Sequence, residues 1–142
     1  KLTVDQLKIL ALSFLLSRVK QNGLKNLDQF SEYLNDQIGS FIDFKDSETQ
    51  FEHLVYTGCA TIVDIVQVNL DQILRANYPG IFQDDNDIET LLIKNATAEK
   101  LFELWRTTDL KSLTLTSVGV VIGKTYSEQV LNIKMDINKW IN

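Results

Sequence analysis

The residues of this chain that could carry out chemistry are few, and two of them lie close together in the sequence. His53, the only histidine, is followed six positions later by Cys59, the only cysteine. These side chains could act as a base and a nucleophile if the fold supplied a third group to orient the histidine. A lone helical histidine next to an acid, here Glu52, is more commonly a surface or half-buried residue. We therefore predict no catalytic residues and no enzymatic activity.

A run of acids at Asp84, Asp85 and Asp87 offers oxygen atoms of the kind that calcium and magnesium prefer. The run lacks the turn glycine and the distant glutamate of an EF-hand loop. Acids also gather at helix N-termini, because the helix dipole attracts negative charge. We predict a helix start here, with no metal site and no cofactor; an enzyme built on these carboxylates is the alternative. A single cysteine also excludes an internal disulfide and zinc sites built from several cysteines.

Two glycines, Gly119 and Gly123, lie about one helical turn apart in a segment whose hydrophobic period changes partway along. Residues 111–115 alternate as in a strand, and Thr116 can then cap a helix that carries both glycines on one face. The segment lacks the glycine and lysine patterns of nucleotide-binding loops. We interpret the glycines as sites of close packing of this helix on its strand pair.

Charge is unevenly distributed along the chain, although the formal net charge of −5 is modest. Residues 1–27 are basic, whereas residues 28–64 carry a strong excess of acids. We predict a candidate interaction face for a basic partner from five acids on two expected helices. These residues are Asp28, Glu32, Asp36, Glu48 and Glu52. Because phosphates would be repelled, nucleic acid is not expected to bind through the helix at residues 47–56.

Hydrophobic spacing and capping signals predict a mainly helical chain with short strands. Helices are expected at residues 3–22, 27–38, 47–56, in a short segment after Asn69 or Asp71, at 88–107 with an interruption near Asn95, and at 116–129; strands are expected at 59–68, 111–115 and 133–137. Ser47 to Gln50 is a capping-box pattern, and Gly58 suits a left-handed exit from the helix. The first helix is apolar around most of its circumference. We place it at the centre of the core, rather than against a neighbouring domain or a second copy.

The fold class predicted from this pattern is α+β, mainly helical with a small antiparallel sheet, and winged-helix-like. The strand at 59–68 would pair with the strand at 111–115, and the helices between them would form a long insertion. We expect a single domain, residues 1–142, excised from a longer protein. The apolar stretches are too short for a membrane span and no signal peptide is visible, so we predict a cytoplasmic protein with no membrane partner.

A family resemblance rests on two segments, His-Leu-Val-Tyr-Thr-Gly-Cys at residues 53–59 and Leu-Thr-Ser-Val-Gly-Val-Val-Ile-Gly at residues 115–123. Together they resemble the C-terminal domain of a group of uncharacterised bacterial proteins. The second segment also resembles the closing Leu-Thr-Pro-x-Gly of Abi-alpha-type abortive-infection proteins, with Ser117 in place of the proline. The resemblance implies a bacterial cytosolic accessory domain that acts in phage defence, and it supplies no catalytic residues.

The function expected from these observations is that of a non-enzymatic interaction or sensor module in a larger bacterial cytosolic protein. It would bind a protein partner, another domain of the same chain or a second copy of itself. Binding would use either the apolar first helix or the acidic face. The alternative is a winged-helix DNA-binding regulator that uses a non-standard surface.

Overall fold

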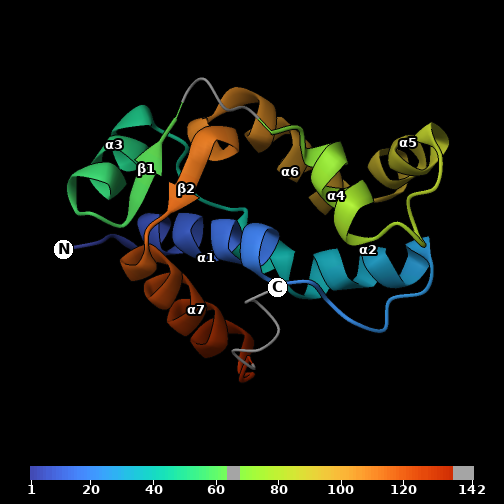
Figure 1. Cartoon of the computed structure of the whole chain (residues 1–142), viewed down its shortest axis with the longest axis horizontal. Helices are drawn as coiled ribbons and strands as arrows, with labels where there is room; N and C mark the ends of the chain where they lie inside the picture. The colour runs from blue at the N-terminus through green and yellow to red at the C-terminus, as the bar shows by residue number, and fades with distance from the viewer. Residues whose placement is uncertain (64–67, 136–142) are drawn as a thin grey trace.

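Helix α1 (Val4–Arg18) lies at the centre of the computed structural model, which describes residues 1–63 and 68–135 (Figure 1). Its N-terminus has the capping box of Thr3 and Gln6: the Thr3 hydroxyl accepts from the Gln6 amide at 3.1 Å, and the Gln6 side chain accepts from the Thr3 amide at 2.9 Å. Every residue from Ile9 to Leu16 is buried. The predicted central position of this helix is confirmed. The prediction that this helix continues to residue 22 is wrong, because α1 ends at Arg18 and the chain is extended at Val19.

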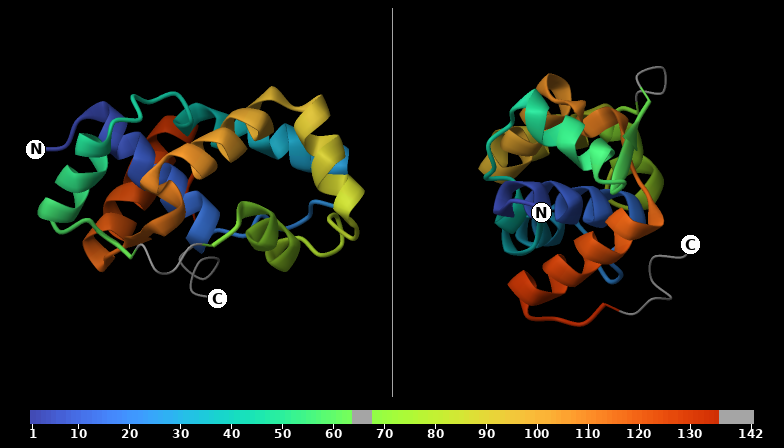
Figure 2. Two further views of the ribbon diagram at one scale, coloured as in Figure 1. Left: turned by 90° about the horizontal axis from the view of Figure 1, so that it is seen from above. Right: turned by 90° about the vertical axis from the view of Figure 1, so that its left-hand side faces the viewer.

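The remaining elements surround α1 in a mainly helical α+β fold, as predicted (Figure 2). In chain order they are α2 (Leu27–Asp36), the 3-10 helix η1 (Ile38–Phe41), α3 (Glu48–Tyr56), β1 (Ala60–Ile62), α4 (Leu70–Asn77), α5 (Asp85–Lys94), α6 (Ala96–Thr107), the 3-10 helix η2 (Asp109–Ser112), β2 (Leu113–Leu115) and α7 (Ser117–Leu131). No helix in the described ranges has both the length and the apolar character needed to cross a bilayer.

Strands β1 and β2 pair antiparallel, which confirms the predicted partners. The register sets Ala60 opposite Leu115 and Ile62 opposite Leu113. Both strands are shorter than predicted. β1 ends at Ile62, and part of the expected strand at 59–68 lies outside the described residues. The expected start of β2 belongs instead to η2, which brings the chain round from the end of α6.

The start of α7 is fixed at the open end of this strand pair. The Thr116 hydroxyl caps α7 by accepting from the Gly119 amide at 3.2 Å, and it donates to the Gly58 carbonyl at 2.6 Å. Gly58 has a φ of +79°, the left-handed exit predicted for it. Gly119 lies directly against the Cys59 carbonyl, so this glycine packs on the strand pair as predicted. Gly123 instead packs on the α1 backbone at Leu10, which the sequence analysis did not foresee.

Three local predictions are wrong. Ser47 makes no side-chain capping bond: the Gln50 backbone amide donates to the Ser47 carbonyl at 3.1 Å, and the Gln50 side-chain nitrogen donates to Asp5 and to the Lys45 carbonyl, each at 3.2 Å. The helix expected at 27–38 ends at Asp36, and the chain tightens into η1. Residues 133–135 form no strand, and the rest of the expected strand at 133–137 lies outside the described residues.

Candidate functional site

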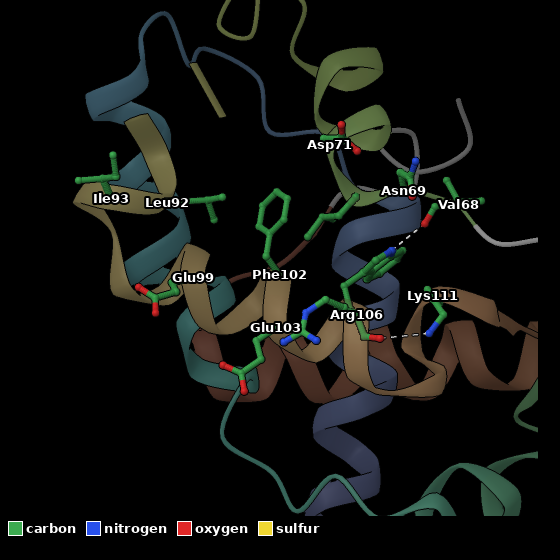
Figure 3. A pocket seen from close by; sticks show the side chains of 12 residues that line it. Val68, Asn69, Asp71, Leu92, Ile93, Glu99, Phe102, Glu103, Arg106 and Lys111 are labelled. Carbon is green, nitrogen blue, oxygen red and sulfur yellow. Dashed lines mark hydrogen bonds between the residues drawn. The ribbon is translucent and has the colours of Figure 1, made fainter. Parts of the chain in front are cut away.

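A groove of about 940 Å³ lies between helices α4, α5 and α6, and we call it the α4–α6 groove (Figure 3). Its volume is in the range of ligand and peptide sites. The lining combines apolar side chains with charged ones. It consists of Val68, Asn69, Leu70, Asp71, Leu92, Ile93, Glu99, Phe102, Glu103, Trp105, Arg106 and Lys111.

The corner between α5 and α6 is set by one buried residue, Asn95. Its amide donates to the Leu91 carbonyl at 2.9 Å and ends α5, while its side chain accepts from the Ala98 amide at 2.9 Å and begins α6. The side-chain amide also donates to the Ser31 carbonyl of α2 at 3.2 Å. The interruption predicted near Asn95 is therefore confirmed, and it is the bend that opens the groove.

The end of α4 is held to α2 by aromatic side chains that pack edge to face. The ring centroid of Phe30 lies 5.0 Å from those of both Tyr78 and Phe82, in edge-on geometry. The Tyr78 hydroxyl accepts from the Gln21 amide at 2.9 Å. Burial raises the pKa of both Tyr33 and Tyr78, so both phenols stay neutral in this corner. α2 thus fixes α4 and the α5–α6 corner, the two sides of the groove.

Phe102 lies in the middle of the groove, with the Leu92 side chain directed toward it, whereas Ile93 points away (Figure 3). Ile93 is 85% exposed. Beyond Phe102 lies Trp105, whose indole N–H donates to the Val68 carbonyl at 2.6 Å. This bond ties α6 to the residues that precede α4. Phe102 and Trp105 are only half-buried, so a bound molecule would cover apolar surface that is now open to water.

Charged side chains surround this apolar floor and leave it uncharged at its centre. Within residues 1–63 and 68–135, the side chains of Asp71, Glu99, Glu103 and Arg106 form no hydrogen bond or ion pair. Lys111 instead donates to the Arg106 carbonyl of α6 at 3.4 Å and to the Thr108 carbonyl, directly after this helix, at 3.3 Å. The four unpaired side chains are therefore available to a bound molecule.

Two smaller hollows adjoin the groove at Lys111. One, of about 320 Å³, lies between the end of α1 and β2 and shares Val68 and Trp105 with the groove. The other, of about 250 Å³, is polar and includes Asp46, Glu48 and Asp109. Among the described residues, no group of three or more histidines, cysteines and acids is placed to hold a metal ion.

The five acids of the predicted interaction face are all exposed, but the fold does not gather them on one surface. Asp28, Glu32 and Asp36 lie on α2, and Glu48 and Glu52 lie on α3. These two helices occupy opposite ends of the molecule in both figures that show the whole chain (Figures 1 and 2). A partner would meet two separate acidic surfaces.

The acids at the start of α5 are engaged within the protein. Asp84 accepts from the Asn86 amide at 2.8 Å, and Asp87 accepts from the Gln83 and Asp84 amides at 2.9 and 3.1 Å. Asp85 forms an ion pair with Arg75 of α4 at 2.9 Å. This is the helix start that the sequence predicted.

His53 and Cys59 are each bound to other residues. The Gln6 side-chain oxygen accepts from Thr3, so the Gln6 amide nitrogen faces His53 Nδ1 at 2.8 Å and must donate to it. Cys59 is buried and accepts from the Thr57 hydroxyl at 3.4 Å. In the described part of the chain, no hydrogen bond joins the histidine to the cysteine.

A protein-family model for an uncharacterised family matches the chain over residues 1–97 and 83–141. The chain belongs to that family. No curated protein and no solved structure gives a significant match. The winged-helix likeness and the resemblance to Abi-alpha-type proteins stay predictions for this family member.

The groove was not predicted from the sequence, although the apolar pattern of α6 includes two of the side chains that line it. Leu101, Phe102, Leu104 and Trp105 form the strongest apolar pattern of α6. Leu101 and Leu104 are almost fully buried, whereas Phe102 and Trp105 line the groove. The sequence held one sign of the groove: these four apolar residues cover more of the circumference of α6 than contact with the core alone requires.

Proposed function

We propose that this chain is a non-catalytic interaction module whose α4–α6 groove binds a segment of a partner protein or of another domain. The observation that supports the proposal is the apolar floor of the groove, where Phe102 and Trp105 are half-buried between α4 and α5. Large aromatic side chains in a concave site contribute much of the binding energy at protein interfaces. Unpaired charges at the edge of the groove would then select the partner.

We propose this groove as the binding surface in place of the two that the sequence suggested, the apolar first helix and the acidic face. The apolar stripe of α1 is buried within the protein, so it is not available to a partner. The acids of α2 and α3 are exposed but separate. Neither surface offers an apolar recess bordered by charges, as the groove does.

The proposal includes the context that the resemblance implies, an accessory domain of a larger bacterial cytosolic protein in phage defence. Deletion of the region encoding the groove would then lower protection against infection. A plaque assay that compares this deletion with Phe102→Ala in the full-length protein tests this part.

The alternative is a winged-helix DNA-binding regulator that uses a non-standard surface. The acids Glu48 and Glu52 are exposed on α3 and would repel phosphates there, so this alternative requires a surface with lysine and arginine elsewhere on the protein. A gel-shift titration at increasing salt tests this alternative. Salt-sensitive DNA binding by the isolated chain would favour it over the interaction module.

The decisive experiment uses Trp105 as a reporter. The chain has two tryptophans, so Trp140→Phe leaves Trp105, which lines the groove, as its single tryptophan. Peptides selected on the chain from a displayed library of random peptides are titrated against this variant. Peptides bound in the groove should shift Trp105 emission, because they exclude water from the indole.

Phe102→Ala should weaken binding of the selected peptides roughly tenfold or more, since an aromatic side chain at the centre of an interface is removed. Val121→Ala is the matched control, because Val121 is 60% exposed on α7, outside the groove lining. Melting temperatures verify that both variants fold. Peptides that bind both variants equally and leave Trp105 emission unchanged would refute the proposed site.

A further inference from the structure

The acids of the α4–α6 groove lie on both sides of its apolar centre. In the view of Figure 3, Glu99 and Glu103 of α6 lie on one side of Phe102, and Asp71 of α4 lies on the other. All three carboxylates lack a partner within the described residues. A molecule that covers Phe102 therefore places its edges next to negative charge on two sides.

The groove also carries two bases, Arg106 and Lys111. Lys111 donates to the Arg106 carbonyl of α6 and to the Thr108 carbonyl that directly follows this helix. In Figure 3 the Arg106 side chain lies on the side of Glu103. Among the described residues, the lining therefore has three unpaired acids against one unpaired base, and negative charge is in excess.

Helices form the walls of the groove, and this limits the conformation of the bound segment. The backbone N–H and C=O groups inside α4, α5 and α6 are bonded within each helix. They cannot form the ladder by which an extended peptide joins a sheet edge. A helix suits such a groove, because it satisfies its own backbone groups and presents only side chains to the walls.

From these observations we infer that the groove binds an amphipathic helix of a partner protein, with lysine or arginine beside its apolar stripe. The apolar stripe covers Leu92 and Phe102, and the basic side chains pair with Asp71, Glu99 and Glu103. Nucleic acids and anionic lipid surfaces would be repelled by these carboxylates. The inference rests on the proposed function and adds the conformation and charge of the bound segment.

Three displayed libraries of equal peptide length separate this inference from the proposed function. The first has apolar residues at helical spacing with lysine, arginine and alanine elsewhere. The second keeps the same apolar spacing but replaces the basic residues with glutamate. The third contains proline at alternate positions and stays extended. Each is selected on the whole chain carrying Trp140→Phe, and bound peptides are titrated by Trp105 emission.

The inference predicts that groove binders come from the basic helical library and gain helical circular dichroism on binding. Groove binders that come only from the acidic or the extended library would overturn the inference and leave the proposed function standing. Groove binders from none of the libraries would refute both. A shift of Trp105 emission with phosphatidylglycerol vesicles, and not with peptides, would also overturn the inference.

Charge-reversal variants test the pairing directly. Glu99→Lys with Glu103→Lys should weaken a basic helical peptide roughly tenfold, since two attractions at the interface become repulsions. Glu52→Lys with Glu89→Lys is the matched control, because it changes the net charge equally at exposed positions outside the groove lining. The control should bind the peptide within about twofold of the parent chain. Equal losses in both double variants would show that only the overall charge matters and would overturn the pairing.

Discussion

Alanine at Gly123 is expected to destabilise the protein, although alanine favours helices over glycine by about 1 kcal/mol. A β-carbon at this position would lie 2.6 Å from the Leu10 carbonyl oxygen and 3.0 Å from Phe14 Cβ. The carbonyl belongs to the backbone of α1, which is buried and cannot rotate away. Overpacking of this kind costs about 1–3 kcal/mol. With both helices rigid we take the upper half of that range, and the net loss is then about 1–2 kcal/mol.

Alanine at Gly119 should cost more. The added β-carbon would meet the Cys59 carbonyl, which already accepts from the Thr116 amide at 3.0 Å. Moving this carbonyl would disturb the end of the strand pair as well as the helix contact. We expect a net loss of about 2 kcal/mol, the upper limit of overpacking less the helix preference of alanine.

Urea unfolding followed by circular dichroism measures these free energies, with Gly80→Ala as the control. A β-carbon at Gly80 meets nothing within 4 Å, so its free energy of unfolding should stay within about 0.5 kcal/mol of the parent. If Gly123→Ala unfolds at the same urea concentration as the parent, or a higher one, the close approach of α7 to α1 is refuted; the same result for Gly119→Ala would refute its close approach to the Cys59 carbonyl. Gly123→Ala tests the contact even if Gly119→Ala fails to fold.

Two further predictions concern the ends of α7. Thr116→Ala should lower the free energy of unfolding by about 1–2 kcal/mol, because it removes the cap of α7 and the bond to the Gly58 carbonyl. Thr116→Ser keeps the hydroxyl and is the control. If both variants lose the same free energy in urea unfolding, the assignment of these two bonds to the hydroxyl is contradicted. Hydrogen bonds from the Met135 amide at 2.7 Å and from Lys124 at 3.0 Å hold the pKa of Glu128 below its usual value. The Glu128 carboxylate therefore stabilises the fold above the ordinary pKa of glutamate, and this contribution is lost as the pH falls through the folded-state pKa. Glu128→Gln should show a smaller fall in melting temperature on acidification than the parent, and an identical fall in both would show that this carboxylate does not contribute.

Local signals in the sequence predicted several boundaries correctly. Thr3 and Thr116 cap helices, Gly58 takes a positive φ, and Asn95 separates two helices. Each of these features depends on interactions within a few residues, so the side-chain types suffice to indicate it. The capping box at Ser47 failed because the side chain of Gln50 bonds to Asp5, a partner far away in the sequence.

The groove could not be predicted for a similar reason. The apolar pattern of α6 contains two rows, one with Leu101 and Leu104 and one with Phe102 and Trp105. Periodicity shows that both rows are apolar but not which one faces the core. That choice is made by Asn95, whose bond to the Ser31 carbonyl sets the α5–α6 corner against α2. The acids of α2 and α3 were grouped because they are close in sequence, and the fold separates them.

The contact between α1 and α7 also has a consequence for synthesis of the protein on the ribosome. Helix α1 is made before α7 and is apolar on most sides, yet the Gly123 backbone that packs on Leu10 is made more than a hundred residues later. At typical translation rates, the ribosome needs roughly 6–20 s to make the residues between them. During this interval α1 has no native cover on that side and is exposed to aggregation. We expect the nascent chain to depend on chaperones until α7 has emerged.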